Sequence, residues 1–534
     1  MATFVASVEN QFASEQVRQA TPSQERRFAI LLVSGLTLFA LLIHGYHPCA
    51  EDGGLYLAGV KRLLDPALYS HGTAFVLEPT RLSLFAPLVA AIVRFTHLTL
   101  PVVLIALHLA SIWATLFAAW MLAARCWTTR TARAGAVVLL ACWLALPVAG
   151  TALALMDPYL TARSLSTPCM ILALAAVLDF TDRNLSNTRR RRGLILWIAS
   201  IALAAAMHPL MAAYALGATM ILACVRSPKP RHRVWGTVAL AAASVAAAAC
   251  IQLTAAPESA DYRRIALTRS YWFPAAWSWY ELAGLAAPLA ILAIFAWGKS
   301  QAPRSHTSNA KAALAQMAFA AGASAWLTAT LFARAGASTH LVARLQPLRV
   351  FHIVYLVMVL FLGAKLGEIL LRRHAFRWAA AMLLLGGIMF ASARSAFPAS
   401  DHLDLPGTTP RNLWVQAFLW IRDNTPRDAL FALDADYINA PNEDAQCFRA
   451  IAERSSLPDY SKDGGEASIA PELTTEWQQG QRAQQQLSAP ATTDAMRVTT
   501  LSPLGVSWLV LDAPAATNLD CPYANPAVKV CRLR

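Results

Sequence analysis

Charged residues are scarce in this chain of 534 residues, because Asp, Glu, Lys and Arg together make up only 14% of it. Soluble domains carry about 25% charged residues. This shortage, together with 57% hydrophobic residues and a mean hydropathy of +0.43, excludes a chain that is soluble throughout. Most of the apolar residues need lipid to face, so the sequence predicts a polytopic α-helical membrane protein.

Acidic residues are missing from the positions where an ion-coupled transporter would need them. Residues 1–393 contain 14 Asp and Glu, and none falls at the centre of an apolar run. Transporters place carboxylates or broken helices near the middle of the bilayer. A transporter is therefore the third choice of function, and the acids gather instead where apolar runs end.

A cleavage site of small residues is also missing after the first apolar run, which disfavours a secretory signal peptide. Residues 1–27 are polar, and the apolar run 28–43 follows them directly. We interpret residues 1–27 as a cytoplasmic N-terminal tail and the run as the first membrane helix.

The net charge of +14 is distributed unevenly. Residues 394–534 hold 12 Lys and Arg against 17 Asp and Glu, a net charge of −5, which leaves +19 for residues 1–393. The basic residues of this first part cluster in short loops, as cytoplasmic loops of membrane proteins do. The positive charge therefore indicates membrane topology and no nucleic-acid partner. The clusters lie at 125–133, 183–192, 226–233, 299–311 and 372–377.

Placing these clusters in the cytoplasm predicts about 11 transmembrane helices within residues 28–393, in a bacterial inner membrane. The first periplasmic loop, 46–100, is the longest, and its apolar stretch 82–95 is short for a crossing, so we place it on the membrane surface. Residues 57–64 of that loop have the pattern of an amphipathic helix lying on the membrane. The predicted helices are 28–45, 101–124, 134–150, 164–180, 193–207, 210–225, 234–255, 281–298, 312–334, 347–370 and 375–393.

Residues 394–534 have the composition of a soluble domain and are predicted to form a small periplasmic α/β domain. A helix containing Trp414, Phe418 and Ile421 opens it, and 429–433, 506–511 and 528–533 have the pattern of strands. Residues 462–498, rich in Gln, Thr, Ala and Gly, are predicted to be a flexible insertion. Cys521 and Cys531 are a disulfide candidate, with Cys447 as the alternative partner.

Acidic residues begin the first outer loop, in HPCAEDGGLYLAGVKRLL, and another lies within the second, in MDPYLTARSLSTP. The first motif contains Glu51 and Asp52, and the second contains Asp157. Carboxylates at the membrane surface can deprotonate an acceptor or bind a cation. The alternative is that Asp52 caps a helix beginning near Leu55, and that Asp157 caps one beginning at Pro158.

With these motifs, the sequence resembles the GT-C superfamily of membrane glycosyltransferases, which includes oligosaccharyltransferases, protein O-mannosyltransferases and aminoarabinose transferases. The resemblance implies that Glu51, Asp52 and Asp157 are catalytic and that Arg163 lies near the donor phosphate. It also implies that the three acids could hold a divalent metal, Mg or Mn, although no full DxD pattern accompanies them. The implied partners are membrane lipids, a polyprenyl-phosphate sugar donor and a periplasmic glycan, lipid or protein acceptor.

Further candidates for substrate binding lie later in the membrane part. Arg344, Gln346 and Arg349 occur together in ARLQPLR at the start of an apolar run, and Arg binds phosphate through two parallel hydrogen bonds. The alternative is that these arginines snorkel to the interface. His208, before Pro209, is a candidate too, although a lone His is more often structural.

The sequence therefore predicts a glycosyltransferase of GT-C type that moves a sugar from a polyprenyl-phosphate-linked donor to a periplasmic acceptor. The alternative is a non-catalytic membrane protein of the same architecture, whose periplasmic domain binds a partner or a polymer.

Overall fold

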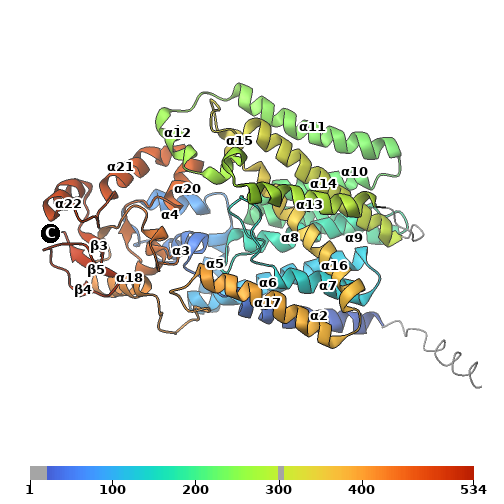
Figure 1. Ribbon diagram of the computed structural model, residues 1–534, viewed down its shortest axis with the longest axis horizontal. Helices are drawn as coiled ribbons and strands as arrows, with labels where there is room; N and C mark the ends of the chain where they lie inside the picture. Colours follow the sequence, from blue (N-terminus) through green and yellow to red (C-terminus); the bar gives the residue numbers. More distant parts are fainter. Residues whose placement is uncertain (1–20, 299–305, 534) are drawn as a thin grey trace, which may run out of the picture.

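The computed structural model describes residues 21–298 and 306–533. Its long helices run side by side in one body, and the strands gather at one end of the molecule (Figure 1). Residues 1–20 of the predicted N-terminal tail, and Lys299 and Arg304 of one basic loop, lie outside the described residues. The long helices are α2 (Pro22–His44), α6 (Leu100–Cys126), α7 (Arg130–Cys142), α8 (Ala162–Thr181), α9 (Asn187–Met207), α10 (Pro209–Val225), α11 (Pro230–Thr254), α13 (Trp279–Trp297), α14 (His306–Phe332), α16 (Phe351–Lys365) and α17 (Ala375–Ala396).

Eight helices of the described residues are long and apolar enough to cross a membrane, or nine if a bent pair is one crossing. The pair joins residues 73–80 to α5 (Phe85–Thr96) at an angle of 93°. Each of the 11 predicted helices has a helical counterpart, but α7, α9 and α10 do not meet the criterion of length and composition. The structure therefore supports a multi-pass membrane protein and leaves the count of 11 as a prediction.

The segment after α7 differs from the prediction. The predicted helix 134–150 ends at Cys142, and residues 143–161 form an irregular segment with a bridge between Pro147 and Ala154. Proline lacks the amide hydrogen that a helix interior needs and restricts the residue before it, which explains the early end. Val148, Leu155 and Met156 are nevertheless buried, so this segment enters the protein interior.

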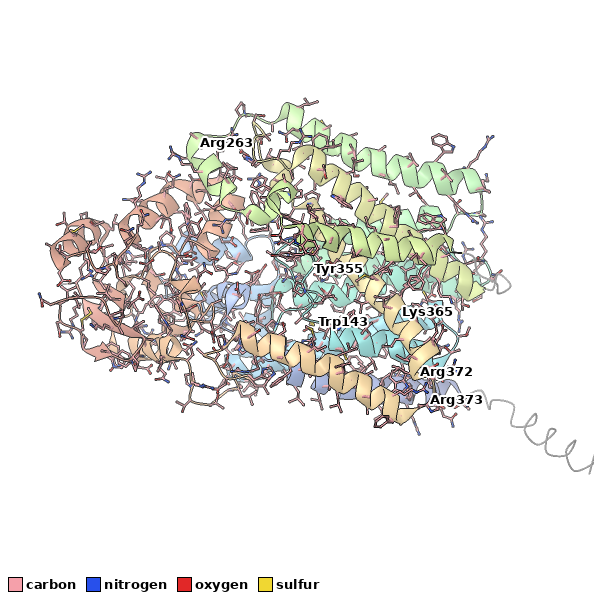
Figure 2. All side chains as sticks on the ribbon, in the orientation of Figure 1. Trp143, Arg263, Tyr355, Lys365, Arg372 and Arg373 are labelled. Atoms are coloured by element: carbon pink, nitrogen blue, oxygen red, sulfur yellow. A yellow bond between two sulfur atoms is a disulfide. The ribbon has the colours of Figure 1, made fainter. Side chains whose placement is uncertain are left out.

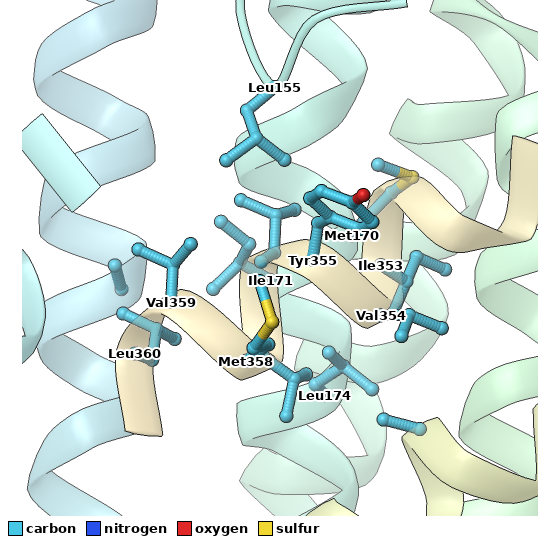
Figure 3. Close-up of a cluster of buried hydrophobic side chains, with 14 of the residues drawn as sticks. Leu155, Met170, Ile171, Leu174, Ile353, Val354, Tyr355, Met358, Val359 and Leu360 are labelled. Carbon is cyan, nitrogen blue, oxygen red and sulfur yellow. The ribbon is translucent and has the colours of Figure 1, made fainter. Parts of the chain in front are cut away.

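The core of the helical body surrounds α16, in which every residue from Phe351 to Phe361 is buried. Its side chains share one buried cluster with those of α8 and with Leu155 from the irregular segment (Figure 3). Two facing glycines bring α16 against α7, since a Cβ on Gly363 would lie 2.4 Å from the carbonyl oxygen of Gly135. Close packing of small residues is the usual way in which membrane helices associate.

Residues 46–100, the predicted first outer loop, contain three α-helices: α3 (Glu51–Leu64), α4 (Thr73–Leu77) and α5. The prediction that the apolar face of residues 57–64 lies on the membrane is wrong. Leu57 and Val60 are buried in one cluster with Phe85, Val89 and two residues of the C-terminal region, Cys447 and Ala450. The apolar face of α3 is therefore covered by protein.

Residues 401–533 contain a sheet of five strands in the order β2-β1-β3-β5-β4, with β2, β1 and β3 parallel and β5 and β4 antiparallel. Trp508 and Val510 of β3 face one apolar cluster, and Leu509 and Leu511 face another, because alternate residues of a strand point to opposite faces. The elements are α18 (Leu413–Asn424), β1 (Leu430–Ala432), α19 (Phe448–Ala452), β2 (Ser455–Ser456), α20 (Lys462–Ile469), α21 (Thr474–Gln484), α22 (Asp494–Leu501), β3 (Trp508–Asp512), β4 (Tyr523–Ala524) and β5 (Val528–Arg532).

The prediction that residues 462–498 are a flexible insertion is wrong, because α20, α21 and α22 occupy them. Trp477 is buried and donates a hydrogen bond to the carbonyl oxygen of Asp459, which fixes α21. The structure also joins Cys521 and Cys531 in a disulfide and leaves Cys447 free.

The C-terminal region and the helical body are in direct contact. Backbone bridges join Tyr46 to Leu403 and Ala50 to Gln446, and Arg269 donates hydrogen bonds to the carbonyl oxygens of Tyr460 and Ser461. The predicted boundary at residue 394 thus marks a change in composition, and the two parts share the interface at which the acidic motif lies.

Candidate functional site

The acidic motif opens α3 directly. The helix begins at Glu51, whose backbone has a φ of 51° and whose amide donates to the carbonyl oxygen of Ala445 at 2.7 Å. Such a φ is uncommon for a residue with a side chain, and strain of this kind gathers at functional sites. The N-cap is Ala50, and within residues 21–298 and 306–533 no side chain caps the helix. Asp52 therefore lies in the first turn of α3 and does not cap the helix, in contrast to the alternative interpretation.

Two glycines allow the start of α3 to enter this narrow place. A Cβ on Gly53 would lie 2.9 Å from the Tyr159 side chain, and one on Gly54 would lie 2.2 Å from Cβ of Cys447. Both contacts are too close for any other residue. The sequence EDGG thus fixes the two acids between the irregular segment of the helical body and the C-terminal region.

Lys462 of α20 reaches both acids. Its Nζ lies 3.0 Å from Oδ1 of Asp52 and forms an ion pair with Glu51. The two acidic side chains keep about two fifths of their surface exposed, at 40% and 41%, whereas Lys462 is 16% exposed. The Lys462 ammonium, helped by the charges of Arg163 and Arg349, lowers the pKa of Asp52 to about 2 against the opposing effect of burial. Asp52 is therefore an ionised, accessible carboxylate at neutral pH.

Asp157 and Arg163 form a buried ion pair, each with 7% of its side chain exposed. Arg163 lies in the first turn of α8, whose start is fixed by a capping box between Thr161 and Ser164. Burial raises the pKa of Asp157, and the Arg163 guanidinium offsets this in part. The carboxylate of Asp157 is thus engaged by Arg163 and does not cap a helix at Pro158.

Arg349 and Gln346 lie on a short segment before α16, with Gln346 in a left-handed backbone conformation. They line a narrow cavity of about 10 Å³ together with Thr151, Tyr271 and Trp272. Three buried polar atoms here have no hydrogen-bond partner among the described residues: Nε of Arg349, Oε1 of Gln346 and Nε1 of Trp272. Orphaned buried polar groups are costly and mark places where a ligand or water completes the bonding.

Of the other predicted substrate-binding residues, His208 lies at this site and Arg344 does not. His208 accepts a hydrogen bond from the Met211 amide at the start of α10, and the charges of Arg349 and Arg163 act on it. Arg344 instead donates to the carbonyl oxygen of Ile469 at 3.1 Å. The gathered set is therefore Glu51, Asp52, Asp157, Arg163, His208, Gln346 and Arg349, with Arg344 turned to the C-terminal region.

Lys462 and Glu466 were missed by the sequence interpretation. They lie four residues apart on α20, and therefore on one face of it. Burial, followed by the negative charges of Asp52 and Asp463, raises the pKa of Glu466 to about 8. The signal was present in KDGGE, a cluster of charges within a segment otherwise poor in them, but its polar composition was interpreted as flexibility.

The three predicted metal ligands are paired with cationic side chains in this structure, and their metal role stays a prediction. The ammonium of Lys462 pairs with both Glu51 and Asp52, and Arg163 engages Asp157. Across residues 21–298 and 306–533, no group of three or more His, Cys, Asp or Glu side chains is placed to hold a metal ion.

Comparisons with known proteins find no matching family model and no matching curated protein. Among solved structures, the chain is similar to the arabinofuranosyltransferase AftD from Mycobacteria, with 16% identity and a TM-score of 0.49. That match covers 95% of this chain and 40% of AftD, so the chain spans about two fifths of the length of that enzyme. A mutant of AftD, R1389S, matches equally well, over 41% of its length.

The chain is also similar to the archaeal oligosaccharyltransferase AglB from Archaeoglobus fulgidus, solved with an inhibitory peptide and a dolichol-phosphate. This match has 11% identity and a TM-score of 0.42, and it covers 92% of this chain and 70% of AglB. The two neighbours are named as an arabinofuranosyltransferase and an oligosaccharyltransferase. With both TM-scores below 0.5, the functional assignment of this chain rests on its own residues.

Proposed function

We propose that this protein is a glycosyltransferase of GT-C type, which transfers a sugar from a polyprenyl-phosphate-linked donor to an acceptor at the membrane surface. One observation carries the proposal. An ionised, accessible carboxylate, Asp52, shares a site with two arginines whose charges act on it. One of these arginines, Arg349, has a buried nitrogen that finds no hydrogen-bond partner in the described part of the chain. Glycosyl transfer needs a base for the acceptor and positive charge for the leaving phosphate.

In the proposed reaction, Asp52 accepts the proton of an acceptor hydroxyl while that oxygen attacks the anomeric carbon of the donor. The bond between the anomeric carbon and the phosphate oxygen breaks, and the polyprenyl phosphate leaves with the bonding electrons. Arg349 and Gln346 donate hydrogen bonds to the phosphate and stabilise its charge. Lys462 has to release Asp52 when the acceptor arrives, since both would occupy the same carboxylate.

The buried pair of Asp157 and Arg163 has a different role in this proposal. Asp157 is little exposed and already engaged, so it is a positioning residue that holds the Arg163 guanidinium beside Asp52. Arg163 supplies further positive charge to the side of the site that receives the phosphate. The proposal therefore assigns proton transfer to Asp52 alone.

The test uses the purified full-length protein in lipid vesicles with a panel of radiolabelled polyprenyl-phosphate pentoses and hexoses. Arg349→Gln is compared with Arg344→Gln, a matched control from the same segment whose guanidinium bonds to Ile469. Charged hydrogen bonds contribute about 1.5–3 kcal/mol, so Arg349→Gln should raise the KM for the donor by roughly 10- to 100-fold. Sugar binding without turnover for every donor would favour the non-catalytic alternative, and equal effects of the two variants would refute the phosphate site.

A further inference from the structure

A second charged cavity lies at the opposite end of the helical body. Figure 2 shows Lys365, Arg372 and Arg373 at this end, far from the strands. The cavity lies between the ends of α6, α8, α9, α10 and α14. Its lining includes four arginines, two aspartates and three leucines: Arg125, Arg189, Arg192, Arg226, Asp179, Asp182, Leu178, Leu185 and Leu196. The lining is thus both cationic and apolar.

Part of the cavity wall is rigidly built. Arg125 donates to Asp179 at 2.8 Å through Nε and to the carbonyl oxygen of Met121 at 2.6 Å through Nη1. Gly193 brings α9 against α8, because a Cβ there would lie 2.9 Å from the Phe180 amide nitrogen. The backbone that presents the arginines of α9 is therefore fixed.

Two of the arginines are free to bind a ligand. Among residues 21–298 and 306–533, the side chains of Arg189 and Arg192 make no hydrogen bond and no ion pair, although both line the cavity. They are three residues apart and share one face of α9. Arg190, between them, points elsewhere and donates to the carbonyl oxygen of Phe180. The four arginines exceed the two aspartates, so the cavity suits a phosphate.

The apolar surface beside the cavity indicates the source of that phosphate. On α9, Ile195 lies three residues from Arg192 and Leu203 lies three turns beyond it, and they are 57% and 54% exposed along the face that carries the arginines. In a membrane this face of α9 lies against acyl chains, so a lipid headgroup can enter the cavity with its own chains along the helix. Basic pockets between membrane helices on the cytoplasmic side are known sites for anionic lipid headgroups.

We propose that this cavity binds the phosphate headgroup of an anionic phospholipid, with Arg189 and Arg192 as its direct ligands and the lipid chain against α9. This site is independent of the carboxylate site and of the proposed transferase activity. Its occupation would fix α9 against α8 and α10 at the end of the body that carries the basic loops.

The test measures thermal unfolding of the full-length protein in nanodiscs of phosphatidylcholine, with and without phosphatidylglycerol. Arg189→Gln with Arg192→Gln is compared with Arg183→Gln with Arg191→Gln, which removes the same charge from neighbouring positions that do not line the cavity. Native mass spectrometry counts the phosphatidylglycerol molecules that stay bound.

We expect phosphatidylglycerol to raise the melting temperature of the wild type and the control, and the Arg189 and Arg192 variant to lose this rise and to bind the lipid at least tenfold more weakly. In pure phosphatidylcholine, all three proteins should melt alike, which shows that the variants fold. Equal stabilisation by inorganic phosphate would identify a soluble anion and overturn the lipid assignment. Equal lipid dependence of both variants would overturn the site.

Discussion

The buried pair of Asp157 and Arg163 allows a sharp test, because removing its two members should have unequal effects. Breaking a buried ion pair by removing one partner costs about 3–5 kcal/mol, since the other charge is left buried and uncompensated. Arg163→Met leaves Asp157 buried beside the charges of Asp52 and Glu51. Asp157→Asn leaves Arg163 facing the negative charge of Asp52, which compensates part of the loss.

We therefore expect Arg163→Met to lower the free energy of unfolding by roughly 3–5 kcal/mol and Asp157→Asn to lower it by less. The double variant should be more stable than Arg163→Met alone, by at least about 1 kcal/mol, because it removes the uncompensated carboxylate. The measurement is reversible unfolding of the detergent-solubilised protein in a double-mutant cycle. Additive losses below about 1 kcal/mol each would show that the pair is not formed and would refute this reasoning.

Three other predictions follow from the fold. Folding raises the pKa of Glu466 from 4.5 to about 8, so its contribution to stability is present below pH 4.5 and is lost as the pH rises through 8. The melting temperature of Glu466→Gln relative to that of the wild type should therefore rise as the pH increases from 4.5 to 8. Melting temperatures with the same pH dependence in both proteins would contradict the assignment. Replacing Cys521 and Cys531 by Ser should lower the free energy of unfolding by about 2–3 kcal/mol, and mass spectrometry after alkylation should find Cys447→Ser unchanged in disulfide content. Reporter fusions after positions 133, 192, 233 and 373 should report cytoplasm and those after 150, 270 and 394 the outside, whereas an outside signal after 133 would make residues 82–95 a crossing.

The sequence located the long helices well, because uninterrupted apolar runs admit few structures other than a membrane helix. It also placed Glu51 and Asp52 together, since adjacent residues need no folding to be neighbours. The end of α7 was missed although its cause is visible in the sequence, where Pro147 follows Leu146. The helix was predicted to continue because the residues after Cys142 are still apolar, although they leave the helix and are buried in an irregular segment.

The partners of the acidic motif could not be found from the sequence. Lys462 lies 410 residues beyond Asp52, and nothing local links the two positions. The face of α3 with Leu57 and Val60 was assigned to lipid, because an apolar stripe looks the same whether lipid or protein covers it. Which surface covers a stripe is decided by long-range packing, here by residues near Cys447.

The central claim is that Asp52 is the base of a transfer reaction from a lipid-linked phosphate. The most direct measurement compares sugar transfer from polyprenyl-phosphate donors by the wild type, by the double variant Glu51→Gln with Asp52→Asn, and by Asp65→Asn. Asp65 is the matched control, because it ends the same helix and pairs with the exposed Arg427. We expect the double variant to reach wild-type abundance in the membrane and to lose at least about 100-fold in rate, the usual contribution of general acid–base catalysis, with Asp65→Asn unaffected. Product formed at the wild-type rate by the double variant would contradict the account.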